Sequence, residues 1–315
     1  MTPSGITFIY SNVTFENADL PFSISESMTL RAAEKNEIEL FNKHLEETYG
    51  KLSQTIVPFD QEPKEINNGE TSKTIYIPSQ YRRWWVIEFN GYNPQILDLE
   101  KVATLINPKL KFGVTFLYRG PNLSGSQSGS MFGGDAIFRI LSEEARKKYQ
   151  KVETKELHRL KSYYENFCSP DGTLKNFKYS LDLFNESSYL WIHSPLLTLS
   201  LFSIIESLTA HKPRLTETLD SITHQLKHKI NLLSRRFDLK LEYKMYFGEI
   251  NPQKVWSKLY AIRSDIAHGQ PLNFDNKNIC LKDIENVNLF LNSVVRELIK
   301  LSIAEPELVK DIQEC

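Results

Sequence analysis

Residues 187–210, SSYLWIHSPLLTLSLFSIIESLTA, are the stretch from which the fold of this 315-residue chain is most readily read. The first nineteen of these residues carry no formal charge, which is long enough for a bilayer span. A span is disfavoured by Pro195 in its middle, by several serines, and by Glu186 and Glu206 at its ends in place of Lys or Arg. We therefore predict no membrane segment but a buried helix over residues 189–210, at the centre of a helical domain.

Three further helices are indicated downstream by apolar residues at three- and four-residue spacing. They are expected over about residues 213–233, 252–268 and 281–301. Four amphipathic helices joined by loops are typical of a bundle, so we predict an all-helical domain over residues 175–315.

The chain before the bundle has a different texture, with short runs of β-branched and aromatic residues. Strands are expected at residues 6–10, 22–25, 53–59, 73–78, 84–89 and 111–118. Helical patterns at residues 34–49 and 94–106 complete a mixed α/β domain over residues 1–140. Residues 141–174, a stretch in which charges of both signs are mixed, are interpreted as a solvated helical connector, and the fold class as a whole is α+β.

The near-neutral charge of the chain hides two opposed parts. Its 38 basic and 39 acidic residues give a net charge of −1, but residues 1–100 carry −7 and residues 101–300 carry +9. Such asymmetry is a usual sign of an anionic partner for the basic part. Three distant cysteines and the absence of a basic segment before the first apolar run favour a reducing, cytoplasmic location.

Two motifs of the N-terminal part can be interpreted either as functional sites or as an ordinary loop or strand. In residues 120–134, GPNLSGSQSGSMFGG, no GK[ST] follows the glycines, and Gln127 stands where a nucleophile elbow needs serine, so we interpret the segment as a mobile loop. The run 81–85, YRRWW, either stacks unpaired bases or begins a buried strand, and we favour the strand.

The second predicted bundle helix carries a basic face that either follows a phosphate backbone or simply keeps the helix in water. Its members proposed for RNA binding are Lys227, Lys229, Arg235 and Arg236. His224 and His228 lie one turn apart on the same helix, but no acidic residue or cysteine adjoins them. We therefore expect neither a metal nor another cofactor.

The third predicted bundle helix ends in KLYAIRSDIAHG, residues 258–269, in which four residues separate Arg263 from His268. This spacing resembles the R-x(4–6)-H motif of the HEPN superfamily, and the wider LYxxRSxIxHG pattern resembles its Apea-like branch, which is associated with bacterial anti-phage defence. IIESL, residues 204–208, is similar to the acidic segment on the first bundle helix of that family. The opening PFSISESMTLRAAEKNEIELF, residues 21–41, is loosely similar to the start of such proteins.

The resemblance implies a metal-independent endoribonuclease that acts as a homodimer on RNA. Arg263 would stabilise charge on the phosphorus oxygens, and His268 would transfer protons, as histidine does well near neutrality. Glu206, Ser264 and Asp265 would support them. Ser264 departs from the Asn, Asp or His that follows the arginine in many active members.

Several alternatives remain open. The bundle could dimerise or bind RNA without cleaving it, or the chain could be the toxin of a toxin–antitoxin pair. Arg263 and Asp265 could form surface ion pairs, with the His268 ring capping the helix by bonding its terminal carbonyls. Glu206 either orients Arg263 or makes an unrelated hydrogen bond. In the defence interpretation, the N-terminal domain holds the activity off until a phage protein or another trigger arrives.

Overall fold

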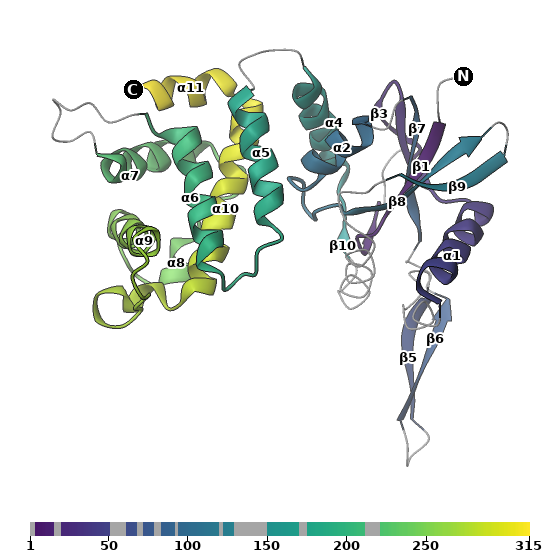
Figure 1. The fold of residues 1–315 in the computed structure, drawn as a ribbon, viewed down its shortest axis with the longest axis horizontal. Helices are drawn as coiled ribbons and strands as arrows, with labels where there is room; N and C mark the ends of the chain where they lie inside the picture. The colour runs from purple at the N-terminus through teal and green to yellow at the C-terminus, as the bar shows by residue number, and fades with distance from the viewer. Residues whose placement is uncertain are drawn as a thin grey trace. The chain divides into compact units, whose positions relative to one another are not determined.

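The chain divides into two compact units, Met1–Cys168 and Ser169–Cys315, in a computed structural model (Figure 1). The structure describes residues 4–15, 20–50, 61–67, 72–78, 83–91, 94–119, 122–128, 150–169, 175–211 and 221–315. Helices and a β-sheet are both present, so the predicted α+β class is confirmed.

The first unit is built on a six-stranded sheet in the order β3-β4-β7-β1-β8-β9, with every neighbouring pair antiparallel. Its strands are β1 (Ser4–Ile9), β3 (Phe22–Ser25), β4 (Met28–Ala32), β7 (Trp85–Asn90), β8 (Phe112–Arg119) and β9 (Asn122–Ser128). Two short sheets accompany it. In one, β2 (Val13–Thr14) pairs with β10 (Gln150–Lys151), and in the other β5 (Gln61–Asn67) pairs with β6 (Ser72–Pro78).

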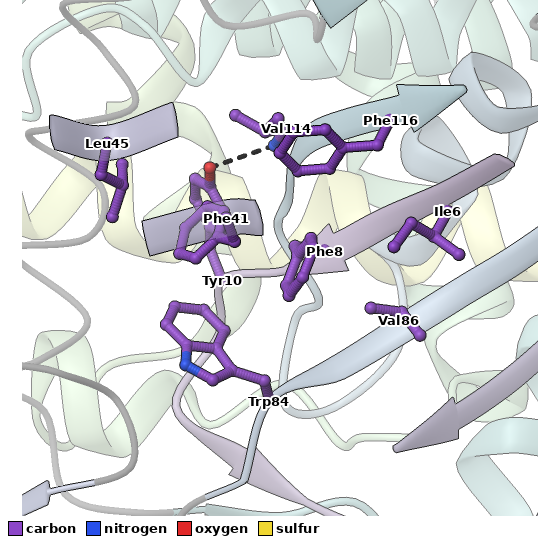
Figure 2. Close-up of a cluster of buried hydrophobic side chains, with 9 residues drawn as sticks. All are labelled: Ile6, Phe8, Tyr10, Phe41, Leu45, Trp84, Val86, Val114 and Phe116. Carbon is purple, nitrogen blue, oxygen red and sulfur yellow. Dashed lines mark hydrogen bonds between the residues drawn. The ribbon is translucent and has the colours of Figure 1, made fainter. Parts of the chain in front are cut away.

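Helix α1 (Lys35–Tyr49) covers one face of the large sheet with an aromatic cluster (Figure 2). The Phe8 ring of β1 stacks on Phe41 of α1 at 4.6 Å, and the Trp84 ring packs edge-on against Phe41 at 4.8 Å. The Tyr10 hydroxyl accepts a 3.0 Å hydrogen bond from the Val114 amide, so this buried polar group is satisfied. Nearly every residue of β1 is buried, so this strand is covered both on the face toward α1 and on the opposite face.

Helix α4 (Thr154–Cys168) belongs to the first unit and corrects the prediction of a solvated connector over residues 141–174. It packs against β3 and α2 (Pro94–Ala103), with Leu157 and Leu160 fully buried. Its buried Glu156 accepts a hydrogen bond from the Asn107 amide at 2.8 Å. An apolar face was present in this charged stretch, but the mixed charges concealed it. Residues 141–149 and 170–174 lie outside the described ranges.

Two other predictions for this unit have clear outcomes. Residues 122–128 form strand β9 beside β8, so the interpretation of residues 120–134 as a loop is wrong for this part. Backbone pairing has overridden the low strand propensity of Gly and Ser. Trp84 and Trp85 are each 5% exposed and lie in the core, as favoured from the sequence. The predicted strand at residues 53–59 lies outside the described residues.

The second unit is helical, and α6 is its central helix. Its elements are α5 (Lys175–Ser187), α6 (Pro195–Thr209), α7 (Ile222–Leu233), η3 (Ser234–Arg236), α8 (Tyr243–Phe247), α9 (Pro252–Ala267), η4 (Asn276–Leu281), α10 (Ile284–Ala304) and α11 (Pro306–Glu314). Helix α6 packs against α5, α7, α9, α10 and α11. Helices α6, α7, α9 and α10 correspond to the four predicted from the sequence, whereas α5, α8 and α11 were not predicted.

The start of α6 shows why its predicted boundary was six residues too early. Ser194 is the N-cap, and its hydroxyl accepts a 3.3 Å hydrogen bond from the Leu196 amide. Pro195 occupies the first helical position, where its missing N–H costs nothing. Within the described ranges, no helix is at once long enough and apolar enough to cross a bilayer.

Candidate functional site

Glu206 of α6 and Arg263 of α9 form an ion pair where these two helices pack together. Arg263 Nη2 donates a hydrogen bond to Glu206 Oε2 at 3.2 Å, and Arg263 Nε lies 3.2 Å from Glu206 Oε1. The side chains are 29% and 17% exposed, so the pair is screened from water without being sealed from it. Of the two possibilities considered from the sequence, the structure thus shows Glu206 in contact with Arg263.

A tyrosine that was not selected from the sequence fixes the guanidinium from a second side. The Tyr260 ring lies one helical turn before Arg263, with its centroid 5.7 Å from Arg263 Cζ, within the range of a cation–π contact. Phe202 of α6 packs edge-on against Tyr260 at 6.3 Å. The i, i+3 spacing of the tyrosine and the arginine was the available signal for this contact.

Arg263 keeps hydrogen-bonding capacity that Glu206 does not use. A guanidinium has five N–H donors, and among the described residues only the bond from Nη2 is made. Arg263 Nε is paired electrostatically but lacks hydrogen-bond geometry, as does Glu206 Oε1. An oxyanion beside this pair would therefore find unused donors.

His268 is the C-cap of α9, and its backbone rather than its ring completes the helix end. The Gly269 amide donates to the Ile266 carbonyl at 3.1 Å, and the Gln270 amide to the Asp265 carbonyl at 2.8 Å. With Gly269 at φ +67, this pattern is a Schellman motif. The His268 ring is exposed and makes no hydrogen bond or ion pair with the part of the chain that the structure describes. The alternative in which the ring caps the helix is therefore not what the structure shows.

The two motif residues point to different sides of α9 within one chain. Five residues correspond to about 140° of rotation around an α-helix. Arg263 faces α6, as its ion pair shows, and His268 projects into solvent. Ser264 and Asp265 are half-buried beside them, and their side chains make no hydrogen bond to another described residue. No Arg263–Asp265 ion pair is formed in the described part of the chain.

Lys229 was predicted to bind RNA on the basic face of α7, and the structure corrects this. Its side chain is 9% exposed and points inward. Lys229 Nζ donates to the Gln313 carbonyl of α11 at 2.9 Å and lies 3.0 Å from His211 Nδ1. This lysine links α7 to α11, which also packs against α6 and α10. The i, i+3 spacing of the buried Leu226 and Lys229 was the sequence signal for this role.

The other predicted RNA-binding residues remain at the surface. Arg236 donates to Glu305 at 2.7 Å, whereas Lys227 and Arg235 form no ion pair with the residues described. The His224 and His228 rings lie 4.2 Å apart on α7. No group of three or more His, Cys, Asp or Glu side chains among the described residues is arranged to hold a metal ion.

No family model matches this chain, and comparison with curated proteins and with solved structures finds no match.

Proposed function

We propose that this chain is a HEPN-type, metal-independent endoribonuclease, with a mixed α/β N-terminal domain followed by a HEPN-like helical bundle. The observation that carries the proposal is the Glu206–Arg263 pair on packed helices, with unused guanidinium donors and an exposed His268 at the end of the same helix. These are the groups that RNA cleavage without a metal requires.

In this reaction the 2′-oxygen of the RNA attacks the adjacent phosphorus, and the bond from phosphorus to the 5′-oxygen breaks. A base removes the proton of the 2′-hydroxyl and an acid protonates the departing 5′-oxygen, leaving a 2′,3′-cyclic phosphate and a 5′-hydroxyl. His268 performs proton transfer, and the Arg263 guanidinium binds the oxygens on which negative charge accumulates. Glu206 holds Arg263 in place, and Ser264 and Asp265 line the same helix end.

A second copy of the chain is part of the proposal because one copy separates Arg263 from His268 around α9. The outward face of α6 is uncharged, and the half-buried Glu206 lies at its edge, toward α9. This face includes Leu196, which is 61% exposed, and the nearby Trp191 is 73% exposed. Exposed apolar groups of this size favour a protein contact. A two-fold axis at this face would bring two copies of the motif together.

The test is RNA cleavage by purified wild-type protein and by Arg263→Ala and His268→Ala variants. His158→Ala and Lys310→Ala are the controls, because both residues are surface-exposed and lie outside the site and outside the predicted RNA-binding set. We expect each site variant to lose about 100-fold or more in rate, the range of acid–base and electrostatic contributions, while the controls cleave normally. Dimer mass in solution should be unchanged, and EDTA should not inhibit. Equal cleavage by all five proteins, or inhibition by EDTA, would refute the proposal.

A non-catalytic module that binds RNA or dimerises is the second candidate. It is favoured by the engagement of Arg263 with Glu206, which is also what a purely structural ion pair would look like. The two candidates differ in outcome: a binding module retains RNA or dimerises, but no cleavage products accumulate.

For the biological role, we propose cytoplasmic abortive-infection defence, in which the acidic N-terminal part responds to a phage protein or another trigger. Residues 1–100 carry a net charge of −7, which suits a part that keeps nucleic acid away. Expression with and without neighbouring genes separates this from a toxin–antitoxin pair. Toxicity that a neighbouring gene relieves in the absence of phage would favour the toxin.

A further inference from the structure

We infer that Lys254 and Lys258, on the outward face of α9, bind RNA phosphates and direct the strand along this helix to His268. The inference rests on the proposed endoribonuclease function and names the part of the molecule that holds the substrate. It differs from the sequence-based expectation, which assigned RNA binding to α7 and η3.

The outward face of α9 is defined by exposure. Lys254, Ala261 and His268 are exposed and Lys258 is partly exposed, whereas Val255, Trp256, Leu259 and Ile262 are buried. At 100° per residue, the four outward positions fall within an arc of about 80°. The two lysines and the histidine therefore share one stripe of the surface.

Both lysines are available to a ligand. Neither lysine side chain forms an ion pair or hydrogen bond within the described part of the chain. Three other cations of the second unit are engaged, Lys244 with Glu249, Arg236 with Glu305, and Lys229 with the Gln313 carbonyl. Lys227 and Arg235 are unpaired among the described residues but do not share a helix with His268. An unpaired lysine binds phosphate without first losing a protein partner, so its contact with RNA displaces only counterions.

The spacing along the helix suits a chain of phosphates. With a rise of 1.5 Å per residue, Lys254 and Lys258 lie about 6 Å apart along the axis, and Lys258 lies about 15 Å from His268. The stripe is on a different side of α9 from Tyr260 and Arg263, which contact α6. A partner copy that meets the His268 end of α9 would leave the two lysines, about 15 Å or more away along the axis, open to RNA.

Asp265 is the acidic residue on this stripe, two turns beyond Lys258 and half-buried. Its carboxylate opposes a phosphate at that level, so we place the bound phosphates at the two lysines. Removing this charge with Asp265→Asn should tighten RNA binding, whereas a surface unconnected with RNA would be indifferent to the change.

The experiment measures binding of a single-stranded RNA oligonucleotide to the full-length protein between 50 and 200 mM salt. The protein carries His268→Ala in every case, so that the RNA stays intact. Lys254→Ala/Lys258→Ala is compared with Lys277→Ala/Lys310→Ala, a matched pair of exposed lysines on η4 and α11. Lys254→Arg/Lys258→Arg retains the charges.

Two lost phosphate contacts should lower the salt slope by about 1.4 and weaken binding about 25-fold at 0.1 M salt, since each contact on single strands contributes about 0.7 to the slope. The Arg pair and the Lys277/Lys310 pair should match the parent. An unchanged slope in Lys254→Ala/Lys258→Ala would overturn the inference, and if wild type still cleaves RNA through His268, the proposed function survives. Absence of both RNA binding and cleavage in wild type would overturn both.

Discussion

Breaking the Glu206–Arg263 pair should destabilise the helical unit by an amount set by its partial burial. At 3.2 Å and an effective dielectric constant of about 20, the gross attraction is about 5 kcal/mol, and desolvation offsets most of it. Exposures of 29% and 17% place the pair between surface pairs, worth about 0–1 kcal/mol, and buried ones. We therefore expect a coupling free energy of about 1–2 kcal/mol.

A double-mutant cycle of Glu206→Gln, Arg263→Met and the double variant measures this coupling. Urea denaturation followed by helical circular dichroism reports mainly on the second unit, because most of the helix lies there. The control cycle uses Arg236→Met and Glu305→Gln, a shorter but more exposed pair at 2.7 Å with exposures of 59% and 33%. A coupling for Glu206 and Arg263 no larger than that of the control would refute the reasoning that burial fixes Arg263.

Three further changes test other parts of the structure. Gly113→Ala places a Cβ about 2.0 Å from the buried Tyr10 ring, so overpacking should cost about 3 kcal/mol in the unfolding of the first unit. Gly269→Ala strains a residue at φ +67 and should cost about 1 kcal/mol while lowering RNA cleavage further than stability predicts, because the turn sets the position of His268. Lys229→Met removes the bonds to α11, and hydrogen exchange should show faster exchange in α11 with little change in α10. Unchanged melting of Gly113→Ala, unchanged RNA cleavage by Gly269→Ala, or unchanged exchange of α11 in Lys229→Met would contradict the corresponding prediction.

Periodic apolar patterns predicted α6, α7, α9 and α10 because burial of apolar side chains determines these helices, whereas α5, α8 and α11 were not predicted. The end of α9 is an example, where Gly269 supplies the positive φ that a Schellman motif needs. Helix α11 was not predicted because its contacts with α6, α7 and α10, among them the bond from Lys229 to the Gln313 carbonyl 84 residues away, are not visible in its own short sequence. Strand β9 was missed for a similar reason: its pairing with β8 overrides its own Gly and Ser composition.

The candidate site was partly accessible from the sequence. A motif at a helix end indicated Arg263 and His268, and the uncharged helix around Glu206 made its carboxylate conspicuous. That Lys229 faces inward while Lys254 and Lys258 face outward depends on which side of each helix meets a neighbour. A cluster of basic letters in the sequence does not contain that information.

The ends of the RNA products formed by wild type and by His268→Ala show most directly whether the protein cleaves RNA through the 2′-hydroxyl with His268 transferring protons. We expect 2′,3′-cyclic phosphate and 5′-hydroxyl ends from wild type and about 100-fold less product from His268→Ala. We expect no cleavage at a nucleotide whose attacking 2′-hydroxyl has been removed by a 2′-deoxy substitution. Equal product from both proteins, or cleavage at the 2′-deoxy position, would contradict this mechanism.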